Sequence, residues 1–227
     1  MAHVPHLYLP GPWMASAIGL EDRQMGHLTR VLRRPSGAVV SYTDGAGLTG
    51  EGTFTGSTVV RGDELLVGRR SPELCLAVAP PRSNDRVRFL VEKLAELGVD
   101  ELRWITTRFG QGTPPAEQKA RAWAIGALEQ SRGAHLMSIS GPVGLDELDE
   151  PLLVGDLHGR DAVPSGLPRY TLVVGPEAGL HDEEIPHRAA RIALSERVLR
   201  TETAAIVGAG ALLGDNVLWK KNKSHPQ

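Results

Sequence analysis

The 227-residue sequence has few cysteines and aromatic residues, and it contains no long apolar run. Its single cysteine, Cys75, excludes an internal disulfide and a cysteine-rich zinc site, so we expect a reducing, cytoplasmic environment. No apolar segment approaches the roughly 20 residues of a membrane-spanning helix, so we expect no membrane partner. The N-terminal stretch MAHVPHLYLPGPW lacks the basic and apolar regions of a signal peptide. Hydrophobic residues still make up 41% of the chain, which is enough for a sizeable core.

A strong charge of one sign is also absent, because 25 basic and 27 acidic side chains leave a net charge of −2. The balance varies along the chain. Residues 141–186 carry 2 basic and 10 acidic side chains, whereas the two ends are neutral to basic. Charge alone therefore neither indicates nor excludes a nucleic-acid partner.

The first 72 residues have the pattern of a small β-rich module. Residues 38–60 form short alternating runs separated by Gly, Asp and Ser, which is typical of hairpins. Before them, Met25, Leu28, Val31 and Leu32 recur at helical spacing, which predicts one short helix. We therefore expect a barrel-like domain over residues 1–72 that carries a single helix.

Residues 73–227 have a different pattern, in which apolar runs alternate with amphipathic stretches. Helices are expected over 85–98 and 114–133, each ending near a glycine. Strands are expected at 74–81, 101–107, 151–157, 170–175 and 191–194. This alternation predicts an α/β domain over residues 73–227 with a parallel sheet covered on both faces.

One glycine motif is interpreted as a turn. The segment GAGLTG fits the dinucleotide-binding pattern through Gly45, Gly47 and Gly50. That fingerprint needs a helix after the glycines, whereas EGTFTGSTVV follows and has the composition of a strand. We therefore predict a hairpin turn here and no nicotinamide-dependent oxidoreductase.

The segment YTLVVGPEAGLHDEEI (170–185) is a stronger candidate for a ligand site. A buried strand ends at Gly175-Pro176, and ligands of open α/β sheets bind at the carboxyl ends of strands. An acidic stretch suited to a helix start follows. Its carboxylates would repel a phosphate, so a cationic or zwitterionic ligand fits better. A plain strand-to-helix turn remains the alternative.

A second loop of the same kind occurs in ALSERVLRTETAAIVGAGALL (193–213). Val198 and Leu199, after a strand, offer an apolar surface for a flat ring. The helix that follows contains Gly208 and Gly210, each costing about 1 kcal/mol relative to alanine. Either another backbone segment passes close to this helix, or small residues fill an ordinary tight core.

Five segments in order along the chain resemble one protein family. They are HLTRVLR (27–33), VEKLAELGV (91–99), EQS (129–131), LVVGPEAGL (172–180) and RVLRTETAA (197–205). The sequence is similar to the SPOUT RNA methyltransferases, in particular the bacterial 16S rRNA uracil-N3 methyltransferases. The resemblance implies a PUA-like N-terminal β-barrel, a C-terminal SPOUT trefoil-knot (α/β knot) domain and a homodimer. It implies methylation of 16S rRNA, within the assembled small ribosomal subunit, with S-adenosyl-L-methionine (AdoMet) as cofactor.

The same resemblance implies roles for individual residues. The AdoMet pocket would be formed by Leu157, His158, Gly175, Pro176, Glu177, Leu194, Val198, Leu199 and Arg200. Arg200 and Arg132 would stabilise the anion that develops on the uracil, and Arg30, Arg33 and Arg34 would bind RNA phosphates. Glu202 would accept the imide proton or, as the preferred interpretation, cap the last helix.

Several positions depart from the family pattern. Ala178 replaces a usual glycine, His181 replaces a hydroxyl helix cap, and Pro186 falls early in the expected helix. EQSRGA reverses the usual order of Arg132 and Gly133, and TTRFGQG (106–112) lacks the usual acidic and basic residues around Arg108. The alternatives are therefore a SPOUT enzyme acting on another base or a ribose, and a non-catalytic RNA-binding protein.

Overall fold

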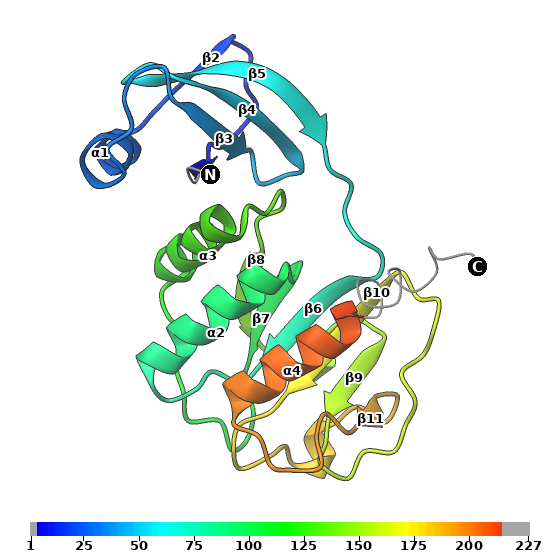
Figure 1. Cartoon of the computed structure of the whole chain (residues 1–227). Coiled ribbons are helices and arrows are strands. Elements are labelled where there is room, and N and C mark those ends of the chain that lie inside the picture. The colour runs from blue at the N-terminus through cyan, green and yellow to red at the C-terminus, as the bar shows by residue number, and fades with distance from the viewer. Residues whose placement is uncertain (1–3, 215–227) are drawn as a thin grey trace. The chain divides into compact units, whose positions relative to one another are not determined.

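The chain divides into two compact units, which Figure 1 shows in a computed structural model that describes residues 4–214. The first unit joins the chain up to Arg69 with Ile125–Leu136. The second joins Arg70–Ala124 with the chain from Met137 onward. The last residues of the predicted second domain, 215–227, lie outside the described residues.

The first unit is built on a curled five-stranded sheet with the order β1-β3-β4-β5-β2. The strands β1 and β3 pair in parallel and all other pairs are antiparallel. Their bounds are β1 His6–Tyr8, β2 Ala17–Gly19, β3 Val39–Thr43, β4 Leu48–Phe54 and β5 Thr58–Leu66. The predicted hairpin region therefore forms β3, β4 and β5. The GAGLTG segment lies at the turn into β4, which confirms that it is no dinucleotide-binding motif.

The expected helix is present but changes its geometry midway. Helix α1 covers Asp22–Gly26 and continues as a π-helical turn, η1, over His27–Val31. The Leu32 N–H donates to the His27 carbonyl five residues back (2.9 Å), so this turn is wider than an α-helical one. Leu28 is fully buried, but Val31 is 66% exposed, because the wider turn rotates it away from the core.

A segment from the middle of the chain completes the first unit. The Tyr8 N–H donates to Glu129 Oε1 (3.0 Å), and His6 Nε2 donates to the Gly133 carbonyl (3.2 Å). The Gly47 N–H donates to the Ala134 carbonyl (3.0 Å). Helix α3 (Glu117–Ser131) thus begins in the second unit and ends in the first.

The second unit contains a six-stranded sheet with the order β11-β9-β10-β6-β7-β8, in which every neighbouring pair is parallel. Its strands are β6 Glu73–Val78, β7 Glu101–Ile105, β8 Ser138–Val143, β9 Leu152–Gly155, β10 Arg169–Val174 and β11 Ala190–Ile192. From β6 the chain proceeds to β7 and β8, and then crosses to β9 on the far side of β10. The carboxyl ends of all six strands therefore meet at one edge, where ligands of such sheets bind.

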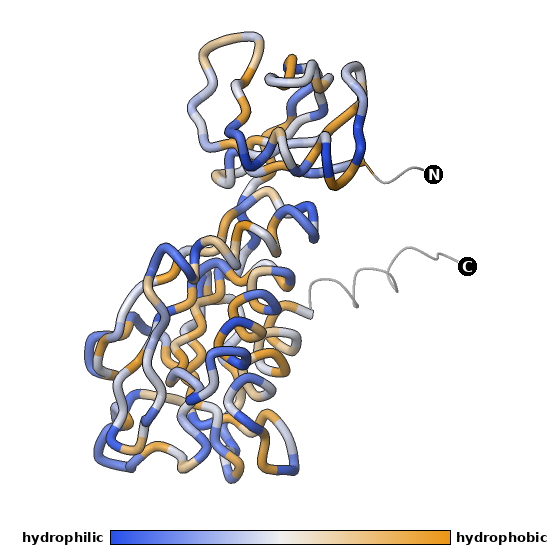
Figure 2. The backbone as a smooth tube through the Cα atoms, turned by 90° about the vertical axis from the view of Figure 1, so that its left-hand side faces the viewer, coloured by the Kyte–Doolittle hydropathy of each residue, from blue (hydrophilic) through white to orange (hydrophobic). Residues whose placement is uncertain are grey.

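Both faces of this sheet are covered, as the sequence predicted. Helix α2 (Asn84–Leu97) packs against α4 (Thr201–Gly214), and α4 contacts β6 and β10. On the other face, Ala77, Val154 and Val173 pack against Leu145 and Ile185. These last two lie in a 3₁₀ turn, η2 (Leu145–Glu147), and in the segment after η3 (Asp182–Glu184). In Figure 2 many residues of the central strands are hydrophobic orange, as expected of a sheet buried on both faces.

Candidate functional site

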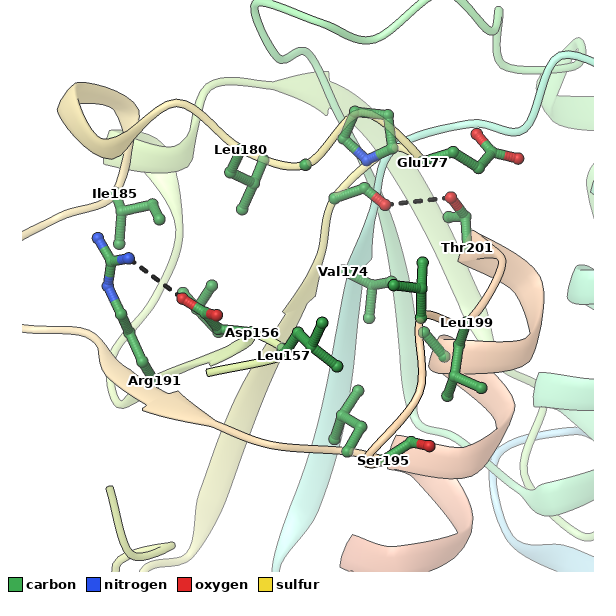
Figure 3. A pocket seen from close by; sticks show the side chains of 18 of the residues that line it. Asp156, Leu157, Val174, Glu177, Leu180, Ile185, Arg191, Ser195, Leu199 and Thr201 are labelled. Carbon is green, nitrogen blue, oxygen red and sulfur yellow. Dashed lines mark hydrogen bonds and ion pairs between the residues drawn. The ribbon is translucent and has the colours of Figure 1, made fainter. Parts of the chain in front are cut away.

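A cavity of about 340 Å³ lies at the carboxyl ends of β9, β10 and β11. Its walls come from the residues that follow each of these strands and from the first turn of α4 (Figure 3). Parallel strands bring these loops together although they lie up to 50 residues apart in the sequence, from Val154 to Ala204.

The loop after β10 is fixed by the start of the last helix. Thr201 Oγ1 donates a hydrogen bond to the Gly175 carbonyl (3.1 Å), as Figure 3 shows. Thr201 is itself buried, so this bond is shielded from water. The Gly175-Pro176-Glu177 segment is therefore held in one position against α4.

Two strand-end glycines allow leucines to line the cavity. A Cβ atom at Gly175 would lie 2.8 Å from Leu180 Cγ, and one at Gly155 would lie 2.9 Å from Leu194 Cδ1. Both distances are too short for a side chain, so glycine at these positions leaves room for the neighbouring leucine. Together with Leu157, Ile185 and Leu199, these leucines form an apolar lining.

An ionic cluster ties the loops after β9 and β10 to β11. Arg191 donates to Asp156 Oδ2 (3.1 Å) and to Asp182 Oδ1 (2.7 Å). The hydrogen bond to Asp182, followed by that to Asp156, raises the pKa of the Arg191 guanidinium above its ordinary value. Asp156 Oδ1 also accepts the His158 N–H (2.8 Å), so this carboxylate is fully engaged.

The charges around the cavity favour a cationic or zwitterionic ligand. Asp156, Glu177 and Asp182 line it, against Arg191 and Arg197. Arg191 is already neutralised by two carboxylates, so the lining offers no concentration of positive charge to a phosphate. No group of acidic, histidine and cysteine side chains within residues 4–214 could hold a metal ion.

Seven of the residues predicted to bind the cofactor line this cavity. They are Leu157, Gly175, Pro176, Glu177, Leu194, Val198 and Leu199. His158 and Arg200 are exposed and do not line it, although their neighbours Leu157, Leu199 and Thr201 do. The sequence reasoning missed Asp156, Leu180, Ile185 and Arg191. Of these four residues, only Asp156 could have been found from the sequence, because it directly follows a buried strand.

The other predicted functional residues lie elsewhere. Glu202, in the first turn of α4, is 7% exposed, and its Oε1 lies 3.6 Å from Arg86 Nε. Arg132 belongs to the first unit, where its guanidinium donates to the Val4 carbonyl.

The three arginines predicted to bind RNA are all near the helix of the first unit. Arg30 and Arg33 are exposed, whereas Arg34 is half-buried. Arg33 has a positive φ of 51°, so it breaks the helical path just after η1. Exposed guanidinium groups at this position are available to an anionic partner.

The fold and the cavity define an α/β protein that binds a small organic ligand at the carboxyl edge of a parallel sheet. Residues 69–213 match the family model described as RNA methyltransferase domain. The chain belongs to this family, which confirms the resemblance found in the sequence.

Solved structures agree with this assignment. A protein from Legionella pneumophila, assigned as a methyltransferase and solved with bound SAM, is 26% identical. Its TM-score is 0.80, with 93% of this chain and 98% of that chain covered. The ribosomal RNA small subunit methyltransferase E of Neisseria gonorrhoeae, bound to S-adenosyl methionine, has the same TM-score and coverage at 22% identity. A protein from Thermotoga maritima, assigned as an RNA methyltransferase, is 25% identical, with a TM-score of 0.73 over 96% of this chain and 99% of that chain.

These similarities confirm the predicted fold class, an N-terminal barrel followed by a C-terminal SPOUT α/β-knot domain. No helix in the described part of the chain is long and apolar enough to cross a membrane.

Proposed function

We propose that this protein is an AdoMet-dependent methyltransferase that methylates N3 of a uridine in 16S rRNA. The observation that carries the proposal is an apolar cavity edged by carboxylates, at the carboxyl ends of β9, β10 and β11, in a chain of the RNA methyltransferase domain family. The bound SAM in the Legionella and Neisseria structures supports AdoMet as the ligand.

The residues of the cavity fit AdoMet in three respects. Leu157, Leu180 and Leu199 provide apolar surface for the adenine ring. Glu177 and Asp182 provide the negative charge that suits a sulfonium and an amino group. The lining also lacks the basic cradle that a nucleotide phosphate would need, which suits a cofactor without phosphate.

AdoMet, when bound, supplies a methyl group whose transfer to N3 forms an N–C bond, breaks the S–C bond and leaves a neutral thioether. The imide proton of uracil must depart in the same reaction, so negative charge develops on the two carbonyl oxygens. The protein can contribute alignment of the two reactants and stabilisation of this charge. Neither contribution requires a metal or a covalent intermediate.

Arg200 is our first candidate for stabilising the uracil anion. It is exposed and lies between Leu199 and Thr201, both of which line the cavity. Arg132 remains the second candidate, although its guanidinium already has the Val4 carbonyl as a partner. For Glu202 we propose a positioning role, because it is buried and paired with Arg86 rather than facing the cavity.

We further propose that the first unit binds RNA through Arg30, Arg33 and Arg34, and that the substrate is the assembled small ribosomal subunit in the cytoplasm. A homodimer would form through the α2 and α4 surface of the second unit. Phe89 of α2 is 46% exposed and Val207 of α4 is 39% exposed, on helices that pack side by side. Such exposed apolar groups are suited to an interface.

Titration of the purified protein with AdoMet by isothermal calorimetry is the first test. For the wild-type protein we expect a Kd on the order of 1 µM, which is about −8 kcal/mol. Because Arg200 does not line the cavity, Arg200→Ala should weaken this binding by less than about tenfold. The turnover of Arg200→Ala should instead fall by about 100-fold, because it loses a group that stabilises the transition state.

Mass spectrometry of 16S rRNA from a deletion strain identifies the product. We expect 3-methyluridine to be lost from one site and restored by the wild-type gene. A modification that disappears at another base or at a ribose would favour the alternative SPOUT specificity. Absence of AdoMet binding would favour a non-catalytic RNA-binding protein.

A further inference from the structure

A second cavity of about 270 Å³ lies in the second unit, at the carboxyl ends of β6, β7 and β10. It is lined by Arg82, Arg86, Phe109 and Gln111, and it shares Pro176 and Glu177 with the first cavity. The two cavities therefore adjoin at the loop after β10. A group transfer between two molecules requires adjoining sites, because the reacting atoms must come into direct contact.

The loop that carries Phe109 and Gln111 is held firmly in place. A Cβ atom at Gly112 would lie 1.8 Å from the Pro80 carbonyl oxygen, so this loop lies directly on the backbone after β6. The Arg108 N–H donates to Glu184 Oε1 (2.6 Å), and the Phe109 ring meets the edge of His181 with centroids 6.1 Å apart. The position of Phe109 is thus fixed on two sides, although the residue is 40% exposed.

The charges of the second cavity differ from those of the first. Arg86 is shared between Glu177 (3.2 Å) and the buried Glu202 (3.6 Å), so its charge is compensated. Arg82 is exposed and has no ion pair among the described residues. Glu177 lines both cavities, but the second also offers the uncompensated guanidinium of Arg82 and the aromatic ring of Phe109.

These features match the parts of a single pyrimidine nucleotide of RNA. Base rings stack on exposed aromatic side chains in single-stranded RNA. The Gln111 amide N–H can donate to a uracil carbonyl, on which negative charge develops when the N3 proton leaves, and this leaves N3 open to the methyl donor. A guanidinium such as that of Arg82 binds phosphate.

We propose that the second cavity holds the target nucleotide, with the base on Phe109, a uracil carbonyl at Gln111 and the phosphate at Arg82. This inference rests on the proposed function, because it places the methyl acceptor next to the methyl donor, at the Pro176–Glu177 segment that lines both cavities. It also gives a role to the FGQG segment, in which the sequence departs from the family pattern. Phe109 and Gln111 are then specificity-determining residues of this chain.

Kinetics with small ribosomal subunits from a deletion strain test the assignment. We expect Phe109→Leu and Gln111→Ala to lower kcat/KM for the subunits by about tenfold or more, with an unchanged Kd for AdoMet. Phe109→Tyr, which retains the ring, should keep wild-type kinetics. Gln118→Ala, which replaces an exposed glutamine on α3, is the matched control for Gln111→Ala.

Cross-linking gives a readout that does not depend on catalysis. Small-subunit rRNA containing 4-thiouridine would be irradiated with the wild-type protein and digested with trypsin, which releases residues 109–119 as one peptide. We expect a cross-link on this peptide that Phe109→Leu weakens.

The two proposals fail in different ways. If AdoMet binds but no cross-link reaches residues 109–119, and the Phe109 and Gln111 variants keep full kcat/KM, the second-cavity assignment is overturned alone. If AdoMet does not bind to the wild-type protein, the proposed function is overturned.

Discussion

At the scale of single residues, the last helix contains two glycines in very different surroundings. A Cβ atom at Gly208 would lie 2.3 Å from Leu172 Cδ2, whereas one at Gly210 would have nothing within 4 Å. The sequence left two explanations open for these glycines, namely close approach of another backbone segment and an ordinary tight core. Close packing is found at Gly208 only, and the neighbour is a side chain of β10 rather than backbone, which fits a tight core. Neither explanation applies to Gly210.

This contrast predicts opposite effects of one substitution. Gly208→Ala should lower the free energy of unfolding by about 1–3 kcal/mol, because Leu172 must leave its rotamer. Gly210→Ala should raise it by about 0.5–1 kcal/mol, because alanine favours the helix and meets no neighbour. Urea denaturation of both variants measures the difference. Equal effects at the two positions would contradict the packing described for α4.

The single cysteine should be chemically silent in the folded protein. Cys75 is 1% exposed in β6, and burial raises the pKa of its thiol to about 12. Because the thiolate is the reactive form, we expect no reaction with Ellman's reagent at pH 8. One thiol per chain should react after unfolding in guanidinium chloride. Rapid labelling of the native protein would show that β6 opens locally.

The sequence could predict the part of the candidate cavity that the backbone after a strand forms. Gly175 and Pro176 directly follow β10, and loops at the carboxyl end of a parallel sheet must meet. His158 and Arg200 were assigned to the same walls but do not line the cavity, since side-chain direction in a loop depends on local φ and ψ. Leu180 was missed, since only its packing over Gly175 brings it to the cavity.

At the scale of elements, β11 holds two loops of the first cavity through Arg191. Asp156 follows β9 and Asp182 begins η3, and both carboxylates bind the same guanidinium. The Arg191 side chain is 38% exposed, so the ion pairs are partly screened by water and their chief effect is to order the loops.

Arg191→Met should therefore weaken AdoMet binding by about 3- to 10-fold, while the melting temperature changes little. Calorimetric titration and thermal unfolding measure the two effects. Arg188→Met, which breaks an ion pair with Glu150 away from the first cavity, is the matched control. A loss of affinity as large in the control as in Arg191→Met would show that general surface charge is responsible.

Most strands of the second unit could be predicted because they are continuous apolar runs. Strand β8 (Ser138–Val143) was missed, since it lies at the sheet edge, is mostly exposed and has only two large aliphatic side chains, Ile139 and Val143. The helix expected after Gly179 is only the 3₁₀ turn η3, because Pro186 cannot donate the hydrogen bond that would extend it. Strand β8 thus forms because of long-range strand pairing, whereas the short length of η3 follows from the local chemistry of Pro186.

At the scale of the whole molecule, the first unit depends on a distant part of the chain. Residues 125–136 supply the partners of His6, Tyr8 and Gly47. A fragment of residues 1–72 would lose these three hydrogen bonds and the packing that accompanies them. The change in composition near residues 69–74 predicted two continuous domains that meet there. Hydrogen bonds between residues some 120 positions apart leave no local pattern in the sequence, so the contribution of residues 125–136 could not be predicted.

We therefore expect the isolated 1–72 fragment to be destabilised by about 1 kcal/mol for each lost hydrogen bond. Urea denaturation followed by tryptophan fluorescence would give a lower midpoint than for the same unit in the full chain. Adding a peptide of residues 117–136 should raise the midpoint of the fragment. A fragment already as stable as the full chain would show that these contacts contribute nothing.

The chain passes between its two units three times, at residues 69–70, 124–125 and 136–137. A module that the chain enters only once can be replaced by a single recombination event. Here, replacing the chain up to Arg69 in one recombination event would leave the 12-residue segment Ile125–Leu136 of the old module in place, although it would not match the new module. The two parts of the first unit must therefore have been inherited together, and substitutions at Glu129 or Gly133 are expected to follow changes in the first 69 residues.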